Sequence, residues 1–554
     1  MKCKITPQST PNLSSPTRRQ FLNRAGGAAA AFGIAGVPAF SHLGAGIAGA
    51  AQSNTANESL RVNRAYQIRQ RAALYQKNLP LPDHPTNGDD ELYANRIGSY
   101  SKGLPHNSLG EVSPGAYDAL LRALATGDAA DYERVPSGGT VKQTDPQAAL
   151  AFELVGSDSH HLGIISPPAF SSAEEAGEMV EIYWQALTRD VPFAHYDADP
   201  LVNAAAAELS RMSDFRGPKE GGQVTPATLF RGASDGCRGG PYISQFLWKN
   251  VPYPATPIVQ RIRAGAPGVD YMTNYPDWLA IQNGAASGRM QMDAAPHYVR
   301  NGRDLAEYVH RDFPYQHFLN AGLLLLSFGG AALDENNPYK GSRNQAGFST
   351  FGGPHVFDLL ARVANCALNC AWYQKWSVHR RLRPEEFAGR VHNHRIGAAI
   401  YPLGLEVLNS RAVDEVFGRY GTYLLPAAFP EGCPTHPAYP AGHATIAGAC
   451  TTVLKAFFNE SFVIPDPVEA RADGLSLEPY GGPALTVGGE LDKLAANVSI
   501  GRDTAGVHWR SDGIEGMRLG EAVAINVLTD LRGGLNERFD GFSLTRFDGT
   551  TITV

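Results

Sequence analysis

Three short segments in the C-terminal half of the chain carry basic side chains and histidines that could together hold an oxyanion. Lys375 is followed eight residues later by Arg383, and Arg502 is followed six residues later by His508. Between these pairs lies Pro-Ala-Gly-His at 440–443. Cations hold concentrated negative charge, glycine allows close backbone approach, and imidazoles exchange protons or bind a Lewis acid. The segments therefore predict a site for an oxyanion such as phosphate or vanadate.

Each segment by itself also has an ordinary structural explanation. The basic run at 379–383 could be a solvated surface, and His443 could be a histidine in a helix-capping loop. His508 could be a buried histidine with satisfied hydrogen bonds. Because all three segments occur together, we favour one common functional site.

The local sequence indicates how these residues are presented. Arg383 precedes Pro384, which disfavours helical backbone and predicts an extended residue. Gly442 precedes an apolar helix, whose N-terminus adds positive potential to a free backbone N–H. We expect His508 in the first turn of the last helix, with Asp512 on the same face to hydrogen-bond its second nitrogen.

The elements that must position these residues are mostly helices. Residues 212–300 are rich in glycine, proline and aromatic residues and predict long ordered loops. No strong alternating strand pattern appears. Packing apolar helix faces together predicts an all-α fold with a helix-bundle core. Helical periodicity marks the ranges 173–188, 305–326 with a break at Pro314, 354–375, 443–458 and 504–531.

Composition and the N-terminus limit the partners and the location. The chain has 554 residues and a formal net charge of −6, which argues against nucleic-acid binding. A twin-arginine motif at 17–22 precedes an Ala/Gly-rich stretch, and predicts a signal peptide over 1–51. Export to the periplasm or medium follows. An uncleaved membrane helix is the alternative, but alanine and glycine make a poor span, so no membrane partner is expected.

Cysteine usage leaves the redox state open. Cys3 lies in the signal, and Cys366 and Cys370 share a helix face without forming a metal-ligand set. Buried free thiols are the default expectation, with one disulfide as the alternative. The remaining cysteines are Cys237, Cys433 and Cys450.

The three segments resemble the motifs K-x(6–7)-RP, P-S-G-H and S-R-x5-H-x3-D shared by vanadium-dependent haloperoxidases and type-2 acid phosphatases. The longer first spacing resembles the bromoperoxidases of red algae and their bacterial relatives. That similarity extends to 183–193, 308–312 and 375–384, and covers most of residues 60–550.

The resemblance implies a role for each site residue. His508 corresponds to the protein ligand of vanadium, His443 to the acid–base histidine, and Gly442 to a backbone donor. Asp512 supports His508. The cations that neutralise the vanadate oxygens correspond to Lys375, Arg383 and Arg502.

Three further residues match positions that surround the cofactor in this family. Asp312 corresponds to a carboxylate that pairs with Arg502. His436 matches a histidine typical of bromoperoxidases, where chloroperoxidases carry phenylalanine, and Trp372 lines the same neighbourhood.

Two positions depart from the family pattern. Ala441 replaces a serine, which removes a hydroxyl donor whose hydrogen bond is worth about 1 kcal/mol. Gly501 replaces the serine before Arg502 and affects the backbone more than ligand contact.

The implied activity is vanadate-dependent oxidation of bromide and iodide by hydrogen peroxide, giving hypohalous acid that halogenates small organic acceptors. His443 would transfer protons, and Lys375 would draw electron density from the bound oxidant. A phosphatase is the first alternative, with His508 as nucleophile. A non-enzymatic oxyanion-binding protein is the second.

The resemblance also implies an organisation. It implies a helical haloperoxidase domain over 111–554 with the vanadate site in 300–531, and a homo-oligomer of two or more copies. The mixture of charge, proline and glycine over 52–110 predicts a surface-wrapping N-terminal arm rather than core. A structural divalent cation occurs in this branch, but its ligands cannot be placed here.

Overall fold

The computed structural model describes residues 48–253 and 255–554. The predicted twin-arginine motif therefore lies outside the described residues. The chain separates into two compact units, 1–67 and 68–554, and helix α2 (Ala48–Lys77) crosses their boundary. Within the described part of the chain, no helix is long and apolar enough to cross a membrane.

The second unit is built mainly from helices, which confirms the predicted all-α class. Its longer helices are α4 (Pro114–Thr126), α6 (Ala173–Thr188), α7 (Pro200–Leu209), α10 (Tyr275–Gln282), α11 (Gly302–Tyr308), α12 (Gln316–Ser327), α13 (Gly353–Trp372), α14 (Pro384–Arg395), α16 (Arg411–Tyr420), α17 (Gly442–Phe457), α18 (Val487–Thr504) and α19 (Arg510–Arg532). Its short helices are α3 (Asp89–Leu92), α5 (Ala129–Tyr132), α8 (Asp235–Arg238), α9 (Gln245–Trp248) and α15 (Leu405–Leu408).

The β-strands of the described residues form two small antiparallel hairpins. Strand β1 (Val468–Ala470) pairs with β2 (Leu477–Pro479), with Glu469 opposite Glu478. Strand β3 (Ser543–Thr545) pairs with β4 (Thr551–Thr553), with Leu544 opposite Ile552.

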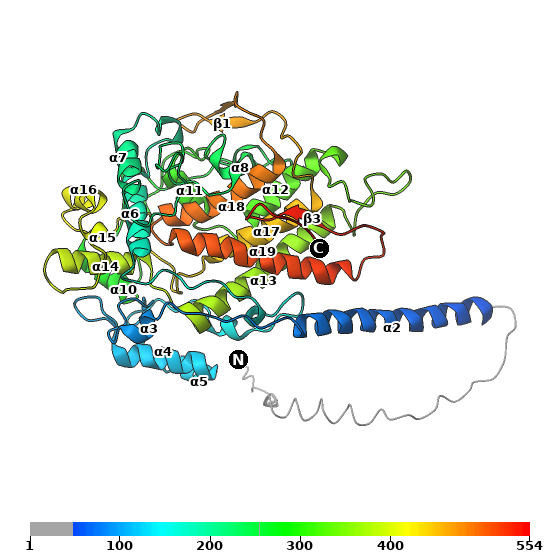
Figure 1. Ribbon diagram of the computed structural model, residues 1–554, viewed down its shortest axis with the longest axis horizontal. Coiled ribbons are helices and arrows are strands. Elements are labelled where there is room, and N and C mark those ends of the chain that lie inside the picture. Colours follow the sequence, from blue (N-terminus) through cyan, green and yellow to red (C-terminus); the bar gives the residue numbers. More distant parts are fainter. Residues whose placement is uncertain (1–47, 254) are drawn as a thin grey trace, which may run out of the picture. The chain divides into compact units, whose positions relative to one another are not determined.

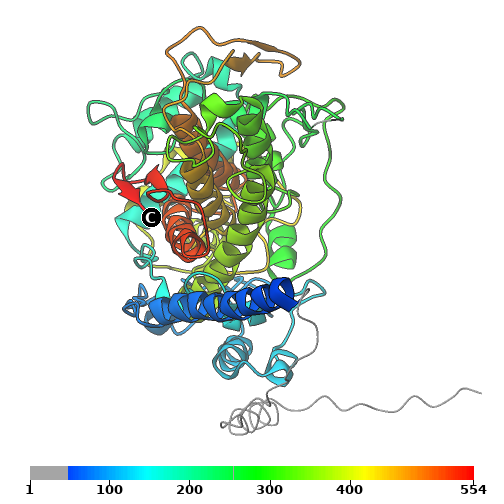
Figure 2. The same ribbon diagram turned by 90° about the vertical axis from the view of Figure 1, so that its right-hand side faces the viewer.

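A bundle of α12, α13, α17, α18 and α19 forms the main core, with α17 packed between its neighbours (Figures 1 and 2). The apolar faces of these helices meet in one continuous buried cluster that includes Leu360, Val363, Val453, Leu494 and Val527. A second cluster gathers around α6, which is almost wholly buried. The bundle matters for function because all three site segments begin or end at its helices.

The predicted helix ranges agree with the structure in most places, but several helices, α14 and α16 among them, lie outside those ranges. The expected break near Pro314 separates α11 from α12. The last helix begins at Arg510 rather than near residue 504, and the preceding helix α18 was not predicted. Three glycines weaken the helical pattern of α18, but packing buries almost every one of its residues. Gly506, with a φ of 83°, makes the turn between the two helices.

The predicted surface arm over 52–110 is wrong for its last part. Residues 97–104 are buried, and Tyr100 and Leu104 belong to a small core with Trp376. Lys102 donates to Glu385 at 2.6 Å and to the carbonyl oxygens of Glu431 and Cys433. A buried ammonium needs such partners, and they anchor this segment to the domain.

Candidate functional site

Lys375 and Arg383 are brought together by the end of α13 and the start of α14. Lys375 lies in a π-helical turn (η5, Tyr373–His379) that continues α13, and its Nζ donates to the carbonyl oxygens of Pro437 and Ala438, both at 2.7 Å. Arg383 has the predicted extended backbone and caps α14. Both side chains are fully buried, so a solvated basic surface is excluded for them.

The guanidinium of Arg383 connects two histidines of the site. Its NH1 donates to His508 Nε2 at 2.9 Å and to the carbonyl oxygen of Val507 at 2.7 Å. Its NH2 donates to His436 Nδ1 at 3.0 Å and, with Nε, to the backbone oxygen of His436. The contacts hold the three side chains in one arrangement.

Arg502 is the third buried cation and ends α18. Its NH1 donates to the carbonyl oxygen of Val309 at 2.6 Å, and its buried Nε has no hydrogen-bond partner in the described part of the chain. Among the residues that the structure describes, neither Arg502, Lys375 nor Arg383 forms an ion pair with a carboxylate. An oxyanion bound here would accept a hydrogen bond from the buried donor and would neutralise the cations.

The clustering of these cations alters their protonation. Burial, reinforced by the neighbouring Arg383, holds the pKa of Lys375 well below its usual range. Burial also lowers the pKa of Arg502 to about 10, with Asp312 opposing the shift and Arg383 adding to it. An anion between these groups would stabilise their charged forms.

His508 is held in one tautomer by a carboxylate. Its Nδ1–H donates to Asp512 Oδ2 at 2.8 Å, as the spacing predicts. His508 precedes α19 instead of lying in its first turn; Asp512 reaches back because it caps the backbone N–H of Trp509. Burial and the nearby Arg383 hold the pKa of His508 well below its usual range. The neutral imidazole therefore has a lone pair on Nε2, which accepts from Arg383 NH1 in this structure. A neutral imidazole of this tautomer is the form that binds a Lewis acid.

The N-terminus of α17 supplies backbone donors at the same place. Gly442 is its first residue, and the first N–H groups of an α-helix have no acceptor within the helix. A Cβ at Gly442 would lie 3.3 Å from the Trp372 ring, tighter than an ordinary contact. Ala441, the N-cap, has no side chain to accept or donate a hydrogen bond.

His443 and Asp312 form a second hydrogen-bonded pair. Asp312 Oδ1 lies 3.0 Å from His443 Nε2, and its Oδ2 lies 2.8 Å from His317 Nε2. The predicted Asp312–Arg502 ion pair is therefore wrong within the described residues, since two imidazoles occupy the carboxylate oxygens. His317 was missed by the sequence analysis; its position five residues after Asp312 was the available signal.

Electrostatics favour an ionised Asp312 and a neutral His443. Although burial opposes it, His443 and His317 hold the pKa of Asp312 well below its usual range. Burial lowers the pKa of His443, and Asp312 works in the opposite direction. If Nε2–H donates to Asp312, the Nδ1 of His443 is free to accept a proton.

His436 and Trp372 lie together beside the cations. Their ring centroids are 4.7 Å apart, and Trp372 Nε1 donates to the carbonyl oxygen of Thr144 at 3.2 Å. Burial and Arg383 hold the pKa of His436 well below its usual range. His436 Nδ1 lies 3.0 Å from Arg383 NH2 and 3.2 Å from the carbonyl oxygen of Pro437.

The structural divalent cation that the resemblance implies stays a prediction without assigned ligands. In the residues that the structure describes, no three His, Cys, Asp or Glu side chains are arranged to hold a metal ion. The five cysteines of that part are buried free thiols.

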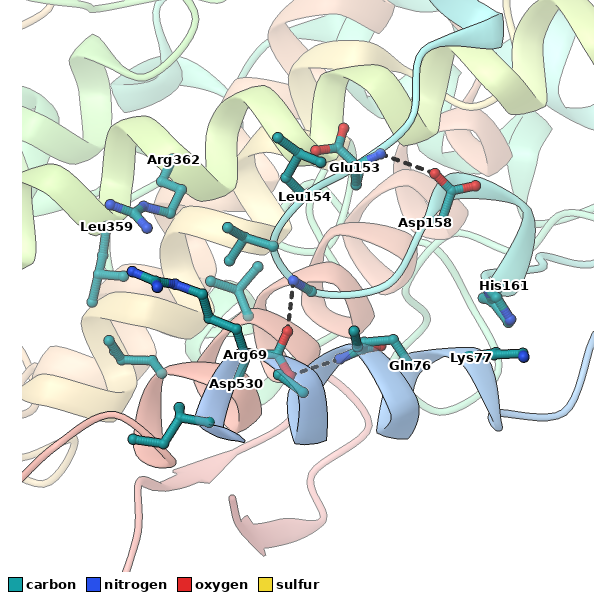
Figure 3. A pocket seen from close by; sticks show the side chains of 17 residues that line it. Arg69, Gln76, Lys77, Glu153, Leu154, Asp158, His161, Leu359, Arg362 and Asp530 are labelled. Carbon is teal, nitrogen blue, oxygen red and sulfur yellow. Dashed lines mark hydrogen bonds between the residues drawn. The ribbon is translucent and has the colours of Figure 1, made fainter. Parts of the chain in front are cut away.

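A separate cavity of about 600 Å³ lies away from these residues, beside the last turns of α2, residues 153–161, α13 and α19 (Figure 3). Asp530 at its wall accepts from Gln76 at 3.1 Å and from the backbone of Gly156 at 2.9 Å. The cavity carries no cluster of catalytic side chains comparable with the site at His508.

Comparison with known proteins gives consistent results. A family model described as the VCPO second helical-bundle domain matches residues 357–536. A vanadium-dependent bromoperoxidase of Ascophyllum nodosum is 36% identical over 498 residues, covering 81% of this chain and 89% of that protein. Another from Corallina pilulifera is 33% identical, covering 90% of this chain and 99% of that protein. The homohexameric structure of a second vanadate-dependent bromoperoxidase from Ascophyllum nodosum superposes with a TM-score of 0.85 at 31% identity, covering 89% of this chain and 90% of that one.

Proposed function

Because the chain belongs to the vanadium-dependent haloperoxidase family, and is therefore an enzyme, we propose that it oxidises bromide and iodide with hydrogen peroxide. The product is hypohalous acid, which halogenates small organic acceptors. The observation that carries the proposal is the group of three buried cations, unpaired with any carboxylate of the described chain, around the neutral His508 imidazole.

The residues present fit vanadate as the cofactor. Lys375, Arg383 and Arg502 would hold its oxygens, the Gly442 N–H would add a backbone donor, and His508 Nε2 would be its ligand. When bound, vanadate supplies a Lewis acid that activates hydrogen peroxide without changing its own oxidation state. The buried Nε of Arg502 has no partner among the described residues and could donate a hydrogen bond to such an oxygen.

The proton transfer is assigned to His443. Its Nδ1 accepts the proton that hydrogen peroxide loses, and Asp312 stabilises the resulting imidazolium through the 3.0 Å contact. Lys375 places a positive charge beside the reacting oxygens and promotes attack by halide. His436 provides a polar imidazole where chloroperoxidases have an apolar ring, which favours bromide.

Assembly and location extend the proposal. We infer a homo-oligomer, supported by the homohexameric relative and by the exposed Leu60, Val62 and Tyr66 of α2. The twin-arginine motif supports export to the periplasm or medium.

Halogenation assays with the purified mature protein test the activity. Bromination of a phenolic dye should require orthovanadate and be suppressed by phosphate, and chloride should replace bromide poorly. Turnover of an aryl phosphate without bromination would instead favour the phosphatase. Vanadate binding without either activity would favour a simple oxyanion-binding protein.

A further inference from the structure

A buried arginine behind His508 holds the carboxylate that orients the imidazole. Arg381 is only 1% exposed, and its NH1 donates to Asp512 Oδ1 at 2.8 Å. The same NH1 donates to Ser511 Oγ, also at 2.8 Å. The other oxygen of Asp512 accepts from His508. Arg381, Asp512 and His508 therefore form one hydrogen-bonded chain that ends at Nε2.

The far edge of Arg381 is fixed to helix α6. Its NH2 donates to Glu178 Oε2 at 2.9 Å and to Glu175. Glu178 also accepts from the backbone N–H of Ser511 at 2.6 Å. The guanidinium carbon lies 4.7 Å from the Trp509 ring centroid. Contacts on two edges and one face leave this side chain a single position.

We propose that Arg381 is a positioning residue for vanadate: it clamps Asp512 and thereby keeps His508 in the tautomer that binds through Nε2. The inference rests on the proposed function, since it concerns the bond between His508 and the cofactor. Arg381 itself does not contact the oxyanion in this proposal.

A planar guanidinium is needed for this task. It presents several N–H donors in a rigid fork, so it can bind Asp512 on one edge and the α6 carboxylates on the other. A lysine ammonium is a point charge on a flexible stem and cannot hold both sides in register. Arg381→Lys therefore keeps the buried charge but loosens the clamp.

Arg510 provides a matched control. It is also buried, begins α19, and donates to Glu181 on the same helix α6 at 2.8 Å. Its other acceptor is the carbonyl oxygen of Arg231, and it has no hydrogen bond to Asp512 or His508. Arg510→Lys disturbs a comparable buried ion pair without disturbing the orientation of His508.

The experiment compares two anions on the same proteins. Phosphate is held by charge and hydrogen bonds alone, whereas vanadate also forms a bond to His508, so the ratio of their dissociation constants isolates that bond. Loss of a partner behind a metal ligand typically weakens metal affinity by about 10–100-fold. We expect Arg381→Lys to weaken orthovanadate binding by about tenfold. Its phosphate affinity should match the wild type, as should both affinities of Arg510→Lys.

Unchanged vanadate affinity in Arg381→Lys, or an equal loss for both anions, would overturn the role of Arg381. An equal loss of vanadate affinity in Arg510→Lys would also overturn it.

If Arg381→Lys does not fold, Glu175→Gln loosens the same clamp from its far end and should weaken the binding of vanadate but not of phosphate. The double variant Arg381→Lys/Asp512→Asn should bind vanadate no more weakly than Asp512→Asn alone. A wild type that binds vanadate no better than phosphate would instead contradict the proposed function.

Discussion

At the scale of single residues, His443 and Asp312 account for proton transfer. Replacing His443 with glutamine removes the base but keeps a side chain of similar size. Turnover of bromide should fall by about 100-fold or more, because general-base catalysis contributes roughly that much. Orthovanadate affinity, measured by equilibrium dialysis, should change little, since the cations remain. The buried His355, outside the site, offers a control: His355→Gln should leave turnover unchanged.

The pH dependence should report the same pair. His443 must be neutral to accept a proton, so kcat/KM falls on the acid side through its pKa. Asp312 raises that pKa by stabilising the imidazolium. In Asp312→Asn the pKa of His443 drops, and the acid limb should move to lower pH while the maximal rate decreases. An acid limb that stays in place, or moves to higher pH, would remove His443 from this role.

At the scale of elements, restoring the family's two serines should have opposite effects. Ala441→Ser at the N-terminus of α17 should be favourable, and Gly501→Ser near the end of α18 should not. Ala441→Ser adds a hydroxyl to a residue that already has a Cβ. A net gain of about 1 kcal/mol, or roughly fivefold, in vanadate affinity follows from one hydrogen bond. Serine also suits an N-cap, so the thermal midpoint should not fall.

Gly501→Ser should be harmful instead. A Cβ there would lie 2.8 Å from Val309 Cγ2 and 3.0 Å from the carbonyl oxygen of Leu305, so α11 would be pushed away from α18. Overpacking of this kind costs about 1–3 kcal/mol. Vanadate affinity should also fall, because Val309 holds Arg502. Denaturant unfolding checks the first effect and dialysis the second; a gain in either quantity would contradict the packing argument.

Sequence spacing predicted the site better than it predicted the helices. The extended Arg383 follows from Pro384, and the Asp512 contact with His508 from a separation of four residues. Two features depend on contacts between distant segments and could not be read in advance: the α18 helix, which packing buries despite its glycines, and the clamp by Arg381. The clamp joins residues more than a hundred positions apart, from the segment between η5 and α14, from α6 and from α19. The His317–Asp312 bond is local, five residues apart, but the spacing alone did not mark it as part of the site.

At the scale of the whole molecule, three buried cations that form no direct ion pair with a carboxylate of the described chain should make folding depend on anions. Their mutual repulsion destabilises the folded state, and an anion that binds only that state stabilises it by mass action. At a hundredfold excess over its dissociation constant, orthovanadate should add about 2.7 kcal/mol. Differential scanning calorimetry should show a higher midpoint with vanadate, a smaller shift with phosphate, and none with chloride. A midpoint insensitive to vanadate would mean that the cations do not form an anion site.

The most direct test of the central claim is a titration of the vanadate-free protein with orthovanadate while bromination is followed. The rate should rise linearly and saturate at one vanadate per chain, and His508→Ala should give no such saturation. Full bromination without vanadate, or a rate that ignores its addition, would contradict the assignment of Lys375, Arg383, Arg502 and His508 as a vanadate site.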